Sequence, residues 1–500
     1  MSFATVSLWL GYIVTLLVLS HLAKGKDALL PGKIGVAIQS MAYVATYISA
    51  VALVGFSGLG HIYGLQIEMI AMGNIWLGVW FVYRYLAWPT KLMQRKLLAR
   101  TPVQLLSRGY RSPGLGRFFG VLAGLLILVY CSAVFKGGAL ILTSAVPLDE
   151  HQALWLLVAL VATSVLWGGL RAVLYTEALQ GLIMAVGVIA IVVGTLSMVG
   201  GPMAALEKLA LEAPTESANN GFLALSSGAP GMHVIFLAFV TSVGVWAQPQ
   251  MIQRHFALKS KAEAQKVIPL AMIWIALLLG GAYFVGSVSR LVLGPEIASP
   301  DHVIPALVKL ILPELGRQIF ALAIVSAALS TASALLHVSC GLLGQDVLGR
   351  SLRGAGWYVA VALGALASGY FAVHSSSIIA LICATSWSII ASAMLVPYLT
   401  LIIKGLSLPS SCAWISSVSG LSACLGWYFF ASPSTSLKIS GMAAPGLIGA
   451  IHPLFIGLVC SAMGMGLGLL LAGGQKTESG PRHRGKSALF VRGKRRSERI

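Results

Sequence analysis

Long apolar runs recur along the chain, and they restrict its fold more than any other sequence feature. The runs are about 18 to 28 residues long, the length at which a helix crosses a hydrocarbon core about 30 Å thick. They are continuous and lack the alternating pattern of an outer-membrane strand, so a membrane barrel is not expected. With 57% hydrophobic and only 10% charged residues, the 500-residue chain also falls outside the usual balance of soluble proteins. These features predict an all-α integral membrane protein.

The runs accommodate about thirteen transmembrane helices. Residues 1–472 are predicted to form one membrane domain, and residues 473–500 to form a basic tail. The predicted spans are 3–22, 39–62, 66–88, 117–145, 152–170, 174–199, 231–253, 268–292, 317–346, 355–373, 376–403, 408–430 and 447–472.

The formal net charge of +19 indicates sidedness rather than a nucleic-acid partner. With the amino terminus outside, 28 of the 34 Lys and Arg residues lie at the inner face, as the positive-inside rule requires. The first span is followed by Lys24, Lys26 and Lys33 and has no basic residue before it, so we expect a retained helix rather than a cleaved signal peptide. The predicted location is the inner (plasma) membrane, with the carboxyl terminus in the cytoplasm.

The tail and the cysteines predict no further catalytic domain or cofactor. Residues 473–500 contain nine basic residues among Gly and Ser, a composition that favours disorder. A solvated tail and a tail bound to anionic lipid headgroups both fit this composition. The six cysteines lie in or beside apolar spans without metal or disulfide spacing, so we interpret them as packing residues.

Polar residues within spans are the natural candidates for function, because they are costly in a bilayer. In the ninth span Ala327, Ser330 and Thr331 share one helical face. Two hydroxyl oxygens at this spacing can bind a small cation, although Ser and Thr in membrane helices often bond back to their own helix. Both interpretations are open from the residues alone.

Two spans show signs of interruption. The second span carries Tyr47 and Ser49 deep in its apolar run and is rich in glycine afterwards, although residues 45–50 contain neither Gly nor Pro. The seventh span contains Gly244 and Pro249. Irregular helices five spans apart are typical of transporters built from inverted repeats, in which freed backbone carbonyls bind ions.

Several segments resemble the sodium/solute symporter family, and the likeness extends over residues 1 to about 472. The matching motifs are GGLRAVLYTEALQGLIM (168–184), AQPQMIQRHFALKS (247–260) and ALSTASALL (328–336). Within the family the chain is most similar to the pantothenate and monocarboxylate branch, through ATYISA (45–50), PDHVIPALVKLILP (300–313) and IHPL (451–454). The resemblance implies a five-plus-five inverted-repeat fold in which spans two to six are repeated, upside down, by spans seven to eleven.

The resemblance also implies a sodium site between the second and ninth spans. By position, its ligands are the carbonyls of Ala45, Ile48 and Ala327 and the hydroxyls of Ser330 and Thr331. The acidic residue that the family often has in its fifth core helix becomes Glu177, which would receive the ion on its pathway or lie at the interface with no direct role.

Departures from the family narrow the expected solute. Tyr47 stands where proline carriers have an aspartate, and Val51 and Ala52 replace polar residues of the sugar carriers, so proline and sugars are disfavoured. The residues expected to line the substrate pocket are Tyr47, Ser49, Ala52, Lys136, Trp246, Gln248, Thr385 and Ser386. Trp246 could equally serve in packing.

Lys136 is the basic residue that lies deepest inside a predicted span. About 28 Å of helix separates it from the inner end of its span near Arg117, so a partnership with Glu177 is not expected. Its ammonium could extend to the headgroups, or it could face an outer vestibule and attract a carboxylate.

The sequence thus favours a sodium-coupled symporter that imports a small organic solute, and not an enzyme. The expected solute is a carboxylate such as pantothenate or a monocarboxylate, and the other partners are sodium and the lipid bilayer. The alternatives are a membrane sensor with a transporter fold and proton-coupled symport, since Glu177 could titrate. An enzyme lacks support because no inward cluster of His, Cys, Asp or Glu suits catalysis.

Overall fold

The structure is a computed structural model, and it describes residues 3–23, 34–212, 221–224, 228–349, 355–375, 378–406, 408–431 and 451–478. This described part consists of helices and connecting turns, without strands. The all-α prediction is therefore confirmed. The last 22 residues of the predicted tail lie outside the described part.

The α-helices, several of which are long, follow one another along the chain and are joined by short connections. The first half contains α1 (Phe3–Leu22), α2 (Val36–Tyr47), α3 (Ser57–Tyr63), α4 (Glu68–Gly73), α5 (Ala87–Leu97), α6 (Pro102–Gly109), α7 (Pro113–Ala145), α8 (Glu150–Val199) and α9 (Pro202–Leu211). The second half contains α10 (Gly228–Ser242), α11 (Pro249–His255), α12 (Lys261–Ile275), α13 (Gly281–Leu293), α14 (Val303–Ile311), α15 (Glu314–Gly341), α16 (Ala355–His374), α17 (Ile379–Lys404), α18 (Ser410–Phe430) and α21 (Pro453–Glu478).

Shorter or wider helical turns connect several of these helices. They are η1 (Val51–Phe56), η2 (Gly64–Ile67), η3 (Asn74–Leu86), η4 (Gly221–Leu223), η5 (Gly244–Ala247), η6 (Ala276–Gly280), η7 (Pro300–His302) and η8 (Leu342–Val347).

Membrane-spanning length is reached by nine helices of the described part, or by ten if one bent pair counts as a single span. Three predicted spans are not counted as separate membrane-spanning helices by length and composition: 39–62, 152–170 and 408–430. The membrane character of the chain agrees with the prediction, and the count of thirteen stays a prediction.

The second and third predicted spans form an antiparallel pair. The Tyr43 hydroxyl donates to the Gly78 carbonyl at 2.8 Å, and the Tyr47 hydroxyl lies 3.0 Å from Asn74 Oδ1. Residue numbers rise along one partner and fall along the other, so the chain reverses between them. Gly64 lies in this reversal with φ of 65° and ψ of −150°, a conformation that is open essentially to glycine alone.

Helix α8 doubles back on itself. As a straight rod its 50 residues would extend about 75 Å. Its contacts with α15 show otherwise, because the position on α15 first rises and then falls along α8. On α15 the facing pairs are Leu157 with Ala328 across Gly138, Ser164 with Ser333, and Gly187 with Ala323, and Gly194 then faces Leu312 just before α15 begins. The fifth and sixth predicted spans therefore lie on oppositely directed arms of α8.

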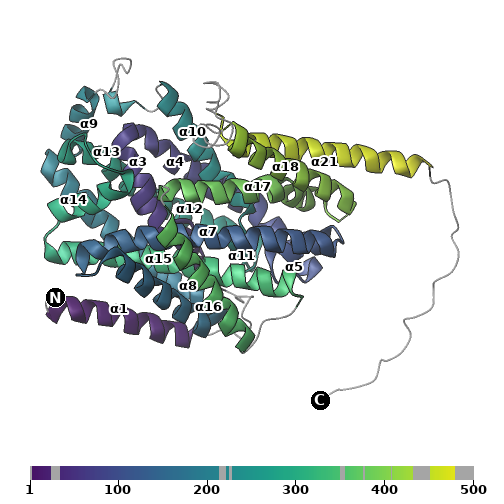
Figure 1. Ribbon diagram of the computed structural model, residues 1–500, viewed down its shortest axis with the longest axis horizontal. Coiled ribbons are helices and arrows are strands. Elements are labelled where there is room, and N and C mark those ends of the chain that lie inside the picture. The colour runs from purple at the N-terminus through teal and green to yellow at the C-terminus, as the bar shows by residue number, and fades with distance from the viewer. Residues whose placement is uncertain are drawn as a thin grey trace.

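The core of the bundle is built around α15, which is buried along almost its whole length. Helices α7 and α8 make the most extensive contacts with it, whereas α1 lies along one edge of the molecule and α18 and α21 along another (Figure 1). The basic segment 89–116 contains most of α5 and all of α6. Helix α21 continues to Glu478, six residues beyond the predicted domain boundary at 472.

Close packing of α17, α18 and α21 generates a testable expectation at Gly420. A Cβ atom there would lie 2.2 Å from the Ser392 carbonyl oxygen and 2.7 Å from Ser461 Cβ, whereas one at Gly426 on the same helix would have no atom within 4 Å. We expect Gly420→Ala to destabilise the protein by about 1–3 kcal/mol through overpacking. Gly426→Ala should be neutral or slightly stabilising. Thermal unfolding in detergent measures both, and equal melting temperatures would contradict this packing.

Candidate functional site

A break in the second predicted span creates the first part of the site. Helix α2 ends at Tyr47, Ile48 is extended with φ of −99° and ψ of 110°, and helical structure resumes at η1. Ser49 stabilises the restart because its Oγ accepts the Val51 N–H at 3.1 Å. In a continuous helix the backbone N–H of Ser49 would donate to the Ala45 carbonyl. Because α2 ends before Ser49, this carbonyl oxygen can accept hydrogen bonds from other partners.

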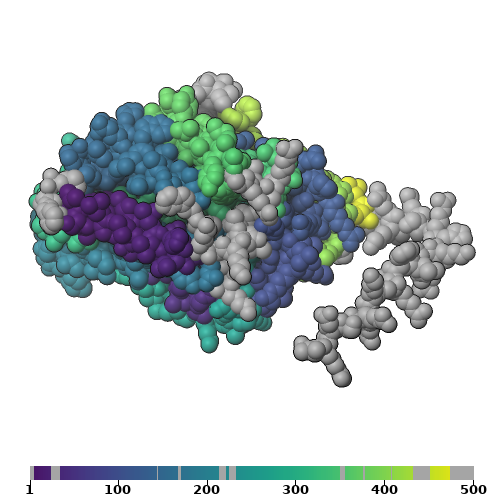
Figure 2. Space-filling model, turned by 90° about the horizontal axis from the view of Figure 1, so that it is seen from below, coloured from purple at the N-terminus to yellow at the C-terminus, as the bar shows by residue number. Residues whose placement is uncertain are grey.

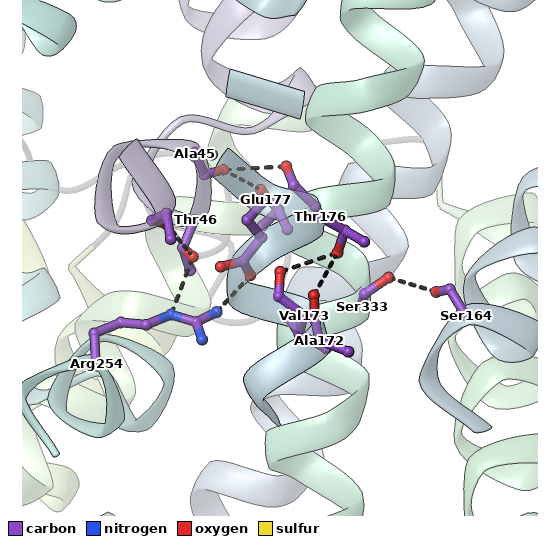
Figure 3. Close-up of polar contacts among 12 residues, drawn as sticks. Ala45, Thr46, Ser164, Ala172, Val173, Thr176, Glu177, Arg254 and Ser333 are labelled. Carbon is purple, nitrogen blue, oxygen red and sulfur yellow. Dashed lines mark hydrogen bonds and ion pairs between the residues drawn. The ribbon is translucent and has the colours of Figure 1, made fainter. Parts of the chain in front are cut away.

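The partners of that carbonyl come from α15 (Figure 3). Ser330 Oγ donates to the Ala45 oxygen at 3.1 Å, and Thr331 Oγ1 lies 3.4 Å from the same oxygen. Ser330 Oγ is also 3.1 Å from the Ala327 carbonyl. Four of the five predicted sodium ligands therefore converge, and Ile48 lies at the adjoining break. The group consists of oxygen donors on buried residues, a set that suits a small hard cation.

An ion pair lies one helical turn from these oxygens. Arg254 on α11 donates from Nη2 to Glu177 Oε1 at 2.5 Å, and from Nε to Thr46 Oγ1 at 3.2 Å (Figure 3). The exposed fractions of the two charged side chains are 1% and 0%. This pair joins α2, α8 and α11. The sequence analysis identified Glu177 but missed its partner, because Arg254 follows the predicted end of the seventh span by one residue.

A cavity of about 220 Å³ connects Glu177 with the oxygen cluster, the group formed by the Ala45 and Ala327 carbonyls and the Ser330 and Thr331 hydroxyls. Glu177, Thr176 and Ser330 line it from α8 and α15, while Tyr12 and other residues of α1 close its outer side. Helix α1 lies along the surface of the molecule in Figure 2. Glu177 Oε2 has no hydrogen-bond partner among the described residues. The geometry thus places a buried carboxylate oxygen and a Ser330 hydroxyl on one cavity wall.

The seventh predicted span is interrupted at the position that its Gly and Pro residues indicated. Helices α10 and α11 meet at an angle of 58°, with η5 and the extended residue Gln248 between them. Gln248 is fully buried, and its Nε2 lies 3.4 Å from the Trp387 carbonyl on α17. This break therefore faces α17, as the first break faces α15.

A second cluster forms where these elements meet α7. Tyr130 lies near Ser49 and packs edge-on against Trp387, with ring centroids 5.3 Å apart. Gln248 reaches Trp387 from the other side. Of the predicted substrate residues, Ser49 and Gln248 belong to this cluster, which also contains two aromatic residues that the sequence analysis missed.

The remaining predicted substrate residues are distributed around that cluster. Ser386 is buried next to Trp387 and bonds to its own helix, as does the half-buried Thr385. Ala52 is buried in η1.

Two aromatic residues predicted to contact the substrate instead join elements of the fold. The Tyr47 hydroxyl lies 2.7 Å from the Thr241 carbonyl, and Trp246 Nε1 donates to the Leu77 carbonyl at 3.0 Å. The Trp246 ring stacks on Phe81 at 4.7 Å. The packing alternative considered for Trp246 agrees with these contacts.

Lys136 lines a different cavity, of about 380 Å³. Its Nζ donates to the Ser375 carbonyl at 2.9 Å. The next residue, Gly137, packs against Ala50 just after the first helix break, and Gly138 borders Ala328 on α15. The base of the Lys136 side chain is therefore level with the oxygen cluster. Glu177, as expected, does not pair with Lys136.

Most of the chain matches a known protein family. Residues 30–404 match the sodium:solute symporter family. The chain is 28% identical over 316 residues to the sodium/pantothenate symporter of Haemophilus influenzae, covering 62% of this chain and 63% of that protein. It is 26% identical over 328 residues to a high-affinity proline transporter of Bacillus subtilis, covering 64% and 68%. The matched region thus spans less than two thirds of the pantothenate relative.

One solved structure shares the fold over nearly the whole chain. It is the substrate-bound outward-open state of a Na+-coupled sialic acid symporter, with a TM-score of 0.73 and 15% identity. The alignment covers 94% of this chain and 98% of that chain. The likeness establishes the inverted-repeat transporter fold that the two interrupted helices predicted.

The buried ion pair yields a stability prediction. Glu177→Ala leaves the Arg254 guanidinium buried without its anionic partner, so we expect a loss of about 3–5 kcal/mol. Joint replacement, Glu177→Gln with Arg254→Gln, should cost less because no buried charge is left alone. The matched control is Glu212→Gln, which removes the partially exposed pair with Arg290 and should cost about 0–1 kcal/mol. Thermal unfolding in detergent would contradict the ion pair if Glu177→Ala and the control were equally stable.

Proposed function

Because the chain belongs to the sodium:solute symporter family, we propose that it couples the inward movement of sodium to the uptake of a small organic solute. The observation that carries the proposal is the convergence of the Ala45 carbonyl with the Ser330 and Thr331 hydroxyls at a helix break. Carbonyl and hydroxyl oxygens replace the hydration shell of a small hard cation. The break supplies the carbonyl, and α15 supplies the hydroxyls.

Sodium is favoured over the proton as the coupling ion. A proton needs a carboxylate that is available to accept it, whereas Glu177 Oε1 is held by Arg254. Glu177 lines the same cavity as Ser330. In this proposal Glu177 contacts sodium on its pathway between the oxygen cluster and the cytoplasm, without being a member of the main ligand set.

The driving force limits what such a carrier can accumulate. One sodium ion crossing about 100 mV supplies about 2.3 kcal/mol, and a tenfold sodium gradient adds about 1.4 kcal/mol. A neutral solute moving with one ion could be concentrated several hundredfold. A monoanion moving with one ion gains no voltage term and reaches about tenfold, so stronger accumulation of an anion requires a second sodium ion.

A carboxylate, such as pantothenate or a monocarboxylate, is the proposed solute. The similarity to the Haemophilus influenzae sodium/pantothenate symporter supports this class of solute. The Lys136 ammonium, which lines a cavity of about 380 Å³, supports it as well. The Bacillus subtilis proline transporter is nearly as similar, but Tyr47 in this chain is buried and bonded to the Thr241 carbonyl. An uncharged phenol engaged in packing does not offer the anionic partner that a solute ammonium needs.

We further propose a plasma-membrane location with the amino terminus outside and the carboxyl terminus in the cytoplasm. The support is the distribution of Lys and Arg residues among the predicted loops. The basic tail would then lie where anionic lipid headgroups are available.

Removal of the α15 hydroxyls tests the ion site. In proteoliposomes, Ser330→Ala and Thr331→Ala should each raise the sodium concentration for half-maximal uptake by about tenfold or more, because each removes one oxygen ligand. Ser339→Ala is the control, since this buried serine of α15 bonds to the Gly124 carbonyl two turns away. Wild-type sodium activation in the inserted double variant would rule out the proposed ligands.

Competition for uptake tests the solute class. Pantothenate, lactate and propionate should compete with one another for sodium-driven uptake, whereas glucose and cationic amines should have little effect. Strong competition by neutral solutes together with none by carboxylates would refute the solute class. Sodium coupling would be unaffected by that result, because it is measured from the dependence of uptake on the sodium gradient.

A further inference from the structure

We propose that the 380 Å³ cavity beside Lys136 is an access site for carboxylates that also carry a hydrogen-bond donor. Lys136 holds the solute carboxylate, and Asp301 accepts from the hydroxyl, amide or ammonium donor. The choice of a carboxylate rests on the proposed function. Assignment of a second, accepting contact to Asp301 goes beyond it.

The position of the cavity suits a site on the way to the centre of the bundle. Its rim includes the exposed residues Glu150 and His302, at the end of the bundle that the charge pattern predicts to be outside. Its inner wall carries Lys136, whose neighbour Gly137 packs against Ala50 beside the break in α2. The cavity therefore extends from the rim to the Lys136 side chain, whose backbone lies beside the break in α2, and its volume is typical of a small-molecule site.

Asp301 is held in place in this cavity, and only one of its two carboxylate oxygens accepts a hydrogen bond from the described part of the chain. It is 5% exposed, and Oδ2 accepts the Ile379 N–H at the start of α17 at 3.3 Å. Oδ1 has no hydrogen-bond partner in the described part of the chain. The η7 turn that carries Asp301 lies tightly on α3, where a Cβ at Gly58 would come within 2.0 Å of the Pro300 carbonyl oxygen. A buried carboxylate oxygen without a hydrogen-bond partner is energetically costly, so a ligand that donates a hydrogen bond to it would be stabilised.

The charges of the cavity also point to a ligand with two functions. Lys136 lies close enough to Asp301 to influence its ionisation, although burial raises the pKa of this carboxyl overall. Glu150 adds a second carboxylate at the rim. A simple carboxylate could bond to Lys136, which also donates to the Ser375 carbonyl, but it would leave Asp301 Oδ1 without a donor. A carboxylate with a donor group satisfies both, so it should be preferred to its unsubstituted analogue.

Equilibrium binding to the full chain in detergent, at saturating sodium, tests this selectivity. Isothermal titration calorimetry would use two probe pairs, lactate against propionate and 4-hydroxybutyrate against butyrate, which differ only in the hydroxyl. We expect the hydroxylated member of at least one pair to bind about tenfold or more tightly. Asp301→Ala should abolish this preference, because it removes the accepting oxygen. Asp301→Asn is not decisive here, because its NH2 group can donate to the hydroxyl oxygen of the probe.

Lys136 provides the complementary variant. Lys136→Gln should weaken binding of all four probes about tenfold, and Lys136→Arg should restore part of it. The controls are Glu314→Gln and Lys309→Gln, two exposed charges on neighbouring elements that do not line the cavity. Both should bind as the wild type does.

The proposal is overturned if no probe binds, if the wild type binds hydroxylated and unsubstituted probes equally, or if Asp301→Ala keeps the preference. It is also overturned if Asp301→Ala changes sodium activation and leaves solute selectivity intact, since the cavity would then be a cation site. Binding is measured without a gradient. A failure of sodium-driven uptake in the wild type would therefore refute the proposed function separately from this selectivity.

Discussion

The satisfaction of backbone hydrogen bonds within the bilayer is the constraint on which the rest of the structure depends. A helix that stops in a hydrocarbon core leaves polar groups that water cannot reach, so a break is tolerated only where protein groups replace the missing bonds. At Ile48 the replacements are the hydroxyls of Ser330 and Thr331, with Ser49 supporting the restart. The requirement explains why α15 is buried over nearly its full length. It also explains why the proposed ion site and the break occupy the same place.

The Glu177–Arg254 pair meets the same constraint for charged groups. Two full charges with almost no exposure are tolerable because they neutralise each other and because Thr46 accepts a further N–H of Arg254. Their positions on α8, α2 and α11 also fix three helices that are distant in sequence. The pair lies beside the oxygen cluster, so local electrostatics there depend on a neutral pair rather than on an isolated carboxylate.

Much of the fold could be predicted from the sequence because span length and apolar composition follow directly from bilayer thickness. The break in the seventh span was also visible, since Gly244 and Pro249 have local conformational preferences. The break at Ile48 had no such signal in residues 45–50, because it arises from tertiary partners on α15.

The candidate site shows the same division between local and tertiary information. The hydroxyl pair of α15 could be recognised from its spacing, and the other ligands from the family resemblance. Tyr130 and Trp387 could not, because aromatic residues in apolar helices look like packing residues until their neighbours are known. The tyrosine contacts have a mechanical consequence of their own. Tyr43 and Tyr47 attach the C-terminal half of α2 to η3 and α10, so these elements are linked as one mechanical unit that is bounded by the extended residues Ile48 and Gln248.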